Sequence, residues 1–170
     1  MRNAWAIRVA TDEVLETSAQ LGVKDIVVYG GPGLPWSPGS AEPLSTPRAT
    51  YDDYVALRKR LESYGLRIAA FEGGFAGMTR FMDIVFGEPR RDERIEELIG
   101  EIRDMARAGV PIYGYHWMPK PVWRSANVRI RGGAEATALD LEQGDARPLG
   151  TDPLPEGADL DEERMWENLE

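Results

Sequence analysis

From Val110 to Asn127 the chain runs VPIYGYHWMPKPVWRSAN, and this stretch indicates the fold more clearly than any other. Its apolar start predicts a strand over residues 110–115, which continues into a loop holding two tryptophans and the only histidine, His116. Flat aromatic side chains and a titratable imidazole at the carboxyl end of a strand are typical of ligand pockets in α/β proteins. The stretch therefore predicts one strand of an α/β sheet with a binding site at its end.

The same alternation of strand and helix extends back to the N-terminus. Short runs rich in apolar residues predict three more strands, at residues 4–9, 25–29 and 66–71. Capping residues and helical spacing predict helices that begin at Thr11, Thr50 and Asp92. Strands that alternate with helices form a parallel sheet with right-handed crossovers.

The segments between these elements also follow a pattern. Long loops follow two of the strands, over residues 30–49 and from Glu72 onward, and they place the variable surface at the carboxyl ends of the strands. The third predicted helix is expected to bury one apolar stripe, made of Ile95, Leu98, Ile99, Ile102, Met105 and Ala106.

The last third of the sequence departs from this rhythm. Residues 127–141 predict a β-hairpin around Gly132 and Gly133, and residues 143–158 are expected to be irregular. A final helix is predicted from Asp159 to Glu170, where its apolar stripe has barely begun. We therefore expect one α/β domain, the N-terminal half of a (β/α)8 TIM barrel with a hairpin insertion after the fourth strand, since a whole barrel takes about 250 residues. The alternative is a small, complete doubly wound sheet.

The composition limits the possible partners. The chain has 170 residues, a net charge of −9 and no cysteine. An acidic protein without clustered Lys and Arg is a poor ligand for nucleic acid or an anionic membrane, and the lack of cysteine excludes disulfides and thiolate metal sites within this chain. No apolar run approaches the roughly 18 residues of a membrane span, and the N-terminus is not a signal peptide, so we expect a cytoplasmic protein.

Four residues are the best candidates for contacting a substrate. His116 and Trp117 follow the fourth strand, Glu72 follows the third, and Arg124 could pair with a carboxylate. The alternatives are a histidine bound by a neighbouring carbonyl, loop packing for the tryptophan, a solvated carboxylate and a surface arginine. Tyr29, at the end of the second strand, is a weaker candidate, and no residue is assigned a catalytic role.

Several other kinds of site find no support in the sequence. The glycines between Gly30 and Gly33 lack the spacing of a phosphate-binding loop and the Lys-Ser/Thr ending, and no helix follows them at once. No Gly-x-Ser-x-Gly motif or cysteine nucleophile is present. One histidine and scattered carboxylates do not form a complete metal site, so no metal ligand is predicted.

The motifs around the fourth strand resemble those of the mannonate dehydratase family. The chain has GVP from Gly109, YHWMP from Tyr115 and then Trp123, where the family pattern is roughly Gly-Ile-Pro, Tyr-Asn-Phe-Met-Pro and Trp. GEPRRD from Gly87 and ALD from Ala138 are similar to family segments too. The resemblance covers nearly the whole chain in order and spacing, although its specific motifs lie within about residues 87–140.

This resemblance implies a xylose-isomerase-like TIM barrel and a hydro-lyase of carbohydrate metabolism. Such an enzyme converts D-mannonate, an intermediate of glucuronate catabolism, to 2-dehydro-3-deoxy-D-gluconate with Mn or Fe(II), whose ligands are expected beyond Glu170. His116 replaces a family Asn and Val122 replaces an Asp, so a sugar isomerase or epimerase on the same barrel stays an alternative. A further alternative is a non-catalytic half-barrel, completed by a partner or by self-association into a homo-oligomer, because its open sheet edges invite pairing.

Overall fold

The computed structural model describes residues 2–29, 49–72, 78–115, 117, 122–149 and 161–170. The chain forms two compact units, one of Met1–Trp117 with Leu160–Glu170 and the other of Met118–Asp159. Each unit is described by itself. The long loop predicted over residues 30–49 lies almost wholly outside the described residues.

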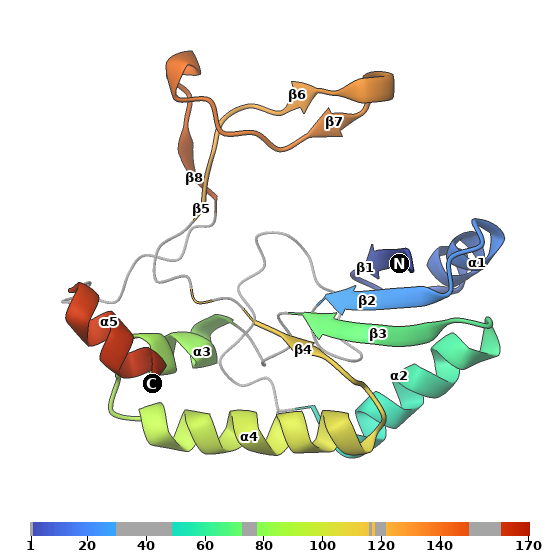
Figure 1. The fold of residues 1–170 in the computed structure, drawn as a ribbon, viewed down its shortest axis with the longest axis horizontal. Coiled ribbons are helices and arrows are strands. Elements are labelled where there is room, and N and C mark those ends of the chain that lie inside the picture. The colour runs from blue at the N-terminus through green and yellow to red at the C-terminus, as the bar shows by residue number, and fades with distance from the viewer. Residues whose placement is uncertain (1, 30–48, 73–77, 116, 118–121, 150–160) are drawn as a thin grey trace. The chain divides into compact units, whose positions relative to one another are not determined.

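The first unit is built on a parallel sheet, which confirms the mixed α/β class (Figure 1). Its strands, in their order across the sheet, are β1 (Ala4–Ile7), β2 (Asp25–Tyr29), β3 (Arg67–Glu72) and β4 (Tyr113–Gly114). Strand β2 has the predicted bounds, whereas β4 is much shorter than the predicted 110–115. Pro111 has no N–H to donate, and this explains why pairing begins only near Ile112, whose carbonyl accepts from the Phe71 N–H at 2.9 Å.

Helices accompany the strands. They are α1 (Asp12–Gln20), α2 (Tyr51–Ser63), α3 (Met78–Val85), α4 (Arg91–Arg107) and α5 (Glu162–Leu169). A side chain caps the start of α1, α2 and α5. At the start of α2 the Thr50 hydroxyl accepts from the Asp53 N–H, and the Asp53 carboxylate accepts from the Thr50 N–H at 2.8 Å. Within the described ranges, no helix is both long and apolar enough to cross a membrane.

Two of these helices differ from the prediction. Helix α3 lies in the region predicted as a loop, because the glycines that follow Glu72 obscured the apolar residues Phe81, Met82, Ile84 and Val85 just beyond them. Helix α5 begins at Glu162 rather than Asp159; the Asp161 carboxylate caps it by accepting from the N–H groups of Glu163 and Arg164. Helices α3 and α5 pack together, and the Asn168 side-chain amide donates to the Val85 carbonyl at 3.0 Å.

The hydrophobic core lies between one face of the sheet and the helices. In β2, Ile26 and Val28 both face the core, since strand side chains alternate between the two faces. The central contact is an edge-to-face pair of Tyr54 from α2 and Phe71 from β3, with ring centroids 5.3 Å apart. Strands and helices contribute the other large members of this core, among them Ile7, Leu15, Ile26, Val28, Leu61, Ile68 and Met105.

Strand β3 carries an irregularity that sets which of its residues face the core. Ile26 pairs with Ile68, but the next residue, Val27, pairs with Ala70, so Ala69 is an extra residue in β3. Ile68 and Phe71 are three positions apart and yet both are buried in the core. The extra residue makes this possible, because regular alternation would place them on opposite faces.

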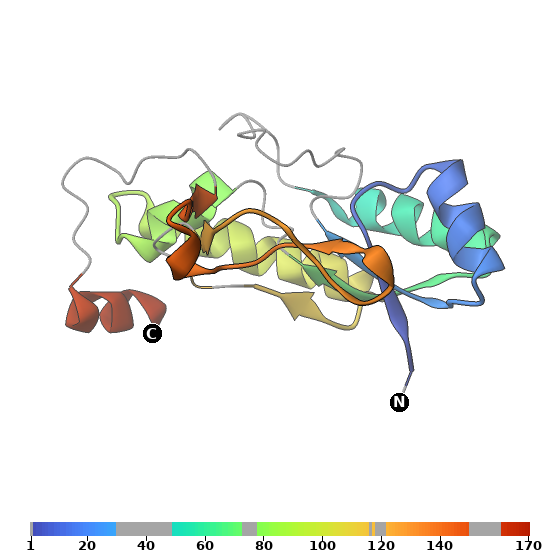
Figure 2. The same cartoon turned by 90° about the horizontal axis from the view of Figure 1, so that it is seen from above.

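The second unit consists of two antiparallel strand pairs. Strand β5 (Val122–Arg124) pairs with β8 (Arg147–Leu149), and β6 (Val128–Arg129) pairs with β7 (Glu135–Ala136). Figure 2 shows β6 and β7 running side by side. Gly132 and Gly133 between them have φ angles of 75° and 79°, which suit glycine. Residues 143–158 were predicted to be irregular; β8 corrects this, since a strand of Arg, Pro and Leu carries no apolar alternation.

Candidate functional site

Polar side chains gather where the parallel strands of the first unit end. Tyr29 pairs with Glu72, and Glu72 pairs with Gly114. The pairing of Ile7 with Val28 brings the next residue of the chain, Arg8, to the level of Tyr29. Arg8, Tyr29, Glu72 and Gly114 therefore form a row across four neighbouring strand ends, which we call the carboxyl-end row.

The strand residues of the carboxyl-end row face away from the helices. The residues just before its members, Ile7, Val28, Phe71 and Tyr113, pack into the core with helices α1, α2 and α4. Successive strand residues point to opposite faces, so the side chains of Tyr29 and Glu72 lie on the other face of the sheet, and Arg8 follows the end of β1. In an open parallel sheet or a barrel, the carboxyl ends of the strands are where ligands bind.

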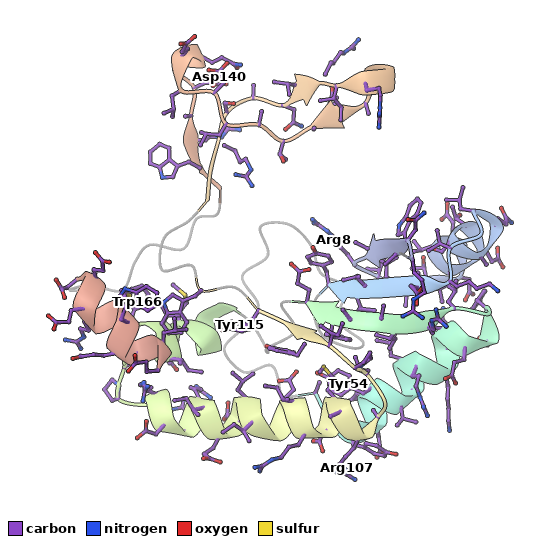
Figure 3. The ribbon with its side chains drawn as sticks, viewed as in Figure 1. Arg8, Tyr54, Arg107, Tyr115, Asp140 and Trp166 are labelled. Atoms are coloured by element: carbon purple, nitrogen blue, oxygen red, sulfur yellow. The ribbon has the colours of Figure 1, made fainter. Side chains whose placement is uncertain are left out.

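Tyr29 and Glu72 are joined by a hydrogen bond between their side chains. The Tyr29 hydroxyl donates to the Glu72 carboxylate, and this bond, with smaller effects of burial and of the Glu72 charge, raises the pKa of Tyr29 above its ordinary value. The positive charge of Arg8 acts in the opposite direction on the pKa of Tyr29, which places Arg8 within electrostatic reach. Figure 3 shows Arg8 beyond the end of β1, beside the end of β2.

Gly114 lies directly beside the Glu72 side chain. A Cβ atom at position 114 would lie 3.4 Å from Cγ of Glu72 and 3.5 Å from the Phe71 carbonyl oxygen. Both distances are ordinary van der Waals contacts, so an alanine would fit here and would touch Glu72. The end of β4 is therefore packed against the Glu72 side chain.

The predicted substrate-contacting residues fall in different places. Glu72 is a member of the carboxyl-end row, and Trp117 is half-buried in the same unit. His116 lies outside the described residues. Arg124 belongs to the second unit, where its Nη1 donates to the carbonyl of its neighbour Trp123 at 2.9 Å. A role in substrate binding stays a prediction for all of them.

Arg8 was not among the predicted site residues. It was included in a strand expected to span residues 4–9, whereas β1 ends at Ile7. The position of Arg8 could have identified it. Arg8 is the first residue after β1, and Glu72 is likewise the last residue of β3. Tyr29, a weaker candidate from sequence, gains support from its bond to Glu72.

The described residues do not form a metal site. Among them, no group of three or more His, Cys, Asp or Glu side chains is placed to hold a metal ion. The carboxyl-end row contains a single carboxylate, and a divalent ion needs several ligands of this kind. The row is suited instead to hydrogen bonds and ion pairing with a polar ligand.

A parallel sheet packed against helices, with an arginine, a tyrosine and a glutamate at its strand ends, defines a protein of the α/β class. Comparison with known proteins makes this class specific. The model of the D-mannonate dehydratase (UxuA) family matches residues 10–169, and the chain belongs to this family.

Individual relatives agree with this assignment. The chain is 25% identical over 140 residues to the mannonate dehydratase of Streptococcus equi subsp. zooepidemicus, and 28% identical over 109 residues to that of Streptococcus pneumoniae. These matches cover 70% and 64% of this chain but only 37% and 28% of the relatives.

A solved structure shares the fold. The crystal structure of mannonate dehydratase from Streptococcus suis serotype 2 matches with a TM-score of 0.68 and 24% identity. The match covers 99% of this chain and 47% of that one, so the chain spans about half the length of this relative.

Proposed function

We propose that this chain supplies the first half of a (β/α)8 barrel that removes water from D-mannonate or a closely related sugar acid. The single observation that carries this proposal is the carboxyl-end row, which lies at the strand ends of a chain of the D-mannonate dehydratase family. The product would be 2-dehydro-3-deoxy-D-gluconate, formed by loss of the proton next to the carboxylate and of a neighbouring hydroxyl group. Together these two losses make one molecule of water.

The residues of this chain would act by binding and orienting the substrate. Glu72 would accept a hydrogen bond from a sugar hydroxyl while Tyr29 holds its carboxylate in place. Trp117 would cover an apolar C–H face of the sugar acid. His116 and Arg124 stay candidates for substrate contacts on the sequence alone. None of these roles removes a proton from the substrate, so the reacting base is expected elsewhere.

A divalent ion, Mn or Fe(II), is implied by the family resemblance. When bound, such an ion polarises carboxylate and hydroxyl oxygens of a substrate. The described residues do not make a site for it, and we propose that its ligands come from the complementary half of the barrel. The family match favours this hydro-lyase over the sugar isomerase or epimerase.

Complementation with a second half tests the proposal. The chain would be produced together with the C-terminal half of the Streptococcus suis mannonate dehydratase and assayed with D-mannonate and Mn for the 2-oxo acid product. We expect product only when both halves are present, and at least about tenfold less with Glu72→Gln, which loses a charged hydrogen-bond acceptor.

The controls separate assembly from chemistry. Glu62→Gln, an exposed change on α2, should leave product formation unaltered. A mixture that co-purifies as a folded complex but forms no product, while the intact Streptococcus suis enzyme is active in the same assay, would contradict the proposed function.

A further inference from the structure

We propose that Arg8 recognises the carboxylate of the substrate, and that the Tyr29–Glu72 pair beside it takes a hydroxyl further along the same molecule. This inference rests on the proposed function and adds a residue that sets its substrate class: sugar acids rather than neutral sugars or polyols. It is carried by the register of the strands, which puts one arginine at the end of the carboxyl-end row.

The charges within the row favour an anionic group at the Arg8 end. Arg8 is exposed and is the only cation of the row, while Glu72 carries its one carboxylate, two strands away. Neighbouring strands are about 4.8 Å apart, so the backbones of Arg8 and Glu72 are about 10 Å apart. This spacing keeps a bound carboxylate away from Glu72, and it matches the scale of an extended six-carbon acid.

The Tyr29 side chain stands between the two charges. Its hydroxyl donates to Glu72, so the phenol stays protonated at neutral pH and adds no charge to the row. Arginine presents five N–H donors in a planar fork, which can bind a carboxylate bidentately while also serving another partner. The row thus offers donors at one end and an acceptor at the other, the complement of a carboxylate followed by hydroxyl groups.

The opposite end of the same strands provides a contrast. There Arg2 and Arg67 both lie beside Asp25, which accepts bidentately from Arg67. That cluster contains a buried carboxylate and holds the sheet together, so it is not expected to attract an anion. Arg2 and Arg8 flank β1 at its two ends and make a matched pair for mutation.

The test compares two ligands that differ only in their first carbon. D-Mannonate has a carboxylate where D-mannitol has a hydroxymethyl group. Binding of each to the 170-residue chain would be followed by isothermal titration and by ¹⁵N NMR shifts. We expect D-mannonate to bind at least about tenfold more tightly than D-mannitol, since charge-assisted hydrogen bonds exceed neutral ones. Arg8→Gln should abolish this difference, Arg8→Lys should retain part of it, and Arg2→Gln should keep it.

Three results would overturn the role of Arg8: equal binding of both ligands, D-mannonate binding unchanged by Arg8→Gln, or no binding of D-mannonate to the folded chain. The NMR spectrum shows whether each variant is folded, so loss of binding through unfolding is recognised. Product formation by the complemented halves would still support the proposed function in these cases. Carboxylate selectivity without product formation would support the role of Arg8 and count against dehydration.

Discussion

The ionisation of Tyr29 depends on two charged neighbours, Glu72 and Arg8. Its bond to Glu72 raises the pKa of the phenol, whereas Arg8 lowers it. Glu72→Gln would remove the negative charge, so the pKa of Tyr29 should return toward its ordinary value of 10.0. A pH titration of ¹³C-labelled tyrosine by NMR would measure this, with Tyr29→Phe identifying the signal. An unchanged pKa in Glu72→Gln would mean that the Tyr29–Glu72 bond does not form in solution.

Tyr54 and Glu101 form a polar pair inside the hydrophobic core. Both side chains are 0% exposed, and the Tyr54 hydroxyl donates to Oε1 of Glu101 at 2.7 Å. Tyr54→Phe removes the donor and leaves a buried carboxylate with one partner fewer, so we expect a loss of about 1–3 kcal/mol in the free energy of unfolding. Urea unfolding would measure it. Tyr64→Phe is the control, because its hydroxyl bonds to Asp12 at the surface, and an equal loss there would contradict this account.

A buried arginine links helices α3 and α4 through charged hydrogen bonds. Arg94 is 4% exposed, and its Nε donates to Asp83 of α3 at 3.0 Å, while Nη1 donates to Glu97 of its own helix at 2.9 Å. Removing one partner of a buried ion pair leaves the other charge without compensation. Arg94 therefore adds a buried ion pair to the apolar packing of α3, in which Ile84 and Val85 are buried.

Arg94→Gln is expected to destabilise the protein by about 3 kcal/mol. The amides of α3 should also exchange with deuterium faster, because the helix loses its anchor. Arg90→Gln, at the N-cap of α4, provides the control: it breaks an exposed pair with Glu93, and such pairs contribute about 0–1 kcal/mol. Comparable losses of stability in the two variants would show that the buried ion pairs of Arg94 stabilise the protein no more than an exposed pair does.

The sequence predicted elements well where local chemistry determines them. The Thr50–Asp53 capping box and the apolar run of β2 are local, and both appear in the structure as expected. The buried stripe predicted for α4 was largely wrong. Met105 is buried, but Ile95, Leu98 and Ile99 are only half-buried and Ile102 and Ala106 are exposed, whereas Glu101 is buried. Tyr54, 47 residues earlier, supplies a hydrogen-bond partner for the buried Glu101, and such a long-range contact leaves no periodic signal.

The candidate site was predictable in its location but not in its membership. The alternation of strands and helices placed the site at the strand carboxyl ends, and Glu72 followed from this rule. Arg8 and Gly114 join the site through the register between strands, which a single sequence does not encode in any local pattern. The Tyr29–Glu72 bond likewise depends on the register between β2 and β3.

For the whole molecule, stability should decline in acid. Arg67, by hydrogen bonding, lowers the pKa of Asp25 below its ordinary value of 3.8 in the folded state. The stabilisation that ionised Asp25 provides is complete above pH 3.8. It is lost as the pH falls through the lower pKa that Asp25 has in the folded state. The urea concentration at the midpoint of unfolding would be measured from pH 6 to pH 2. Below pH 3.8 it should fall less steeply in Asp25→Asn than in the unmodified chain. The exposed Asp52→Asn is the control, and a profile for Asp25→Asn that matched the control would contradict the assignment.

The sheet of the first unit has two edges, and apolar residues are exposed at both. Trp5 on β1 is 42% exposed and Ile112, beside β4, is 57% exposed. Open edges favour pairing between chains, so we expect a homo-oligomer whose fraction rises with concentration. Sedimentation velocity would measure it, and Ile112→Lys should shift the distribution toward monomer. Leu141→Lys, an exposed change in the second unit, is the control; a concentration-independent monomer would contradict the expectation.

The extra residue at Ala69 gives the end of β3 one residue to spare. If Ala69 were deleted, Ala70 would follow Ile68 directly, and the pairs of Val27 with Ala70, Val28 with Phe71 and Tyr29 with Glu72 could all be kept in a regular register. Ile68 and Phe71 would then be two positions apart, the spacing that regular alternation places on one face of a sheet. Descendants of this gene should therefore survive the loss of the Ala69 codon more readily than the loss of the Phe71 codon, which would take an aromatic ring out of the core.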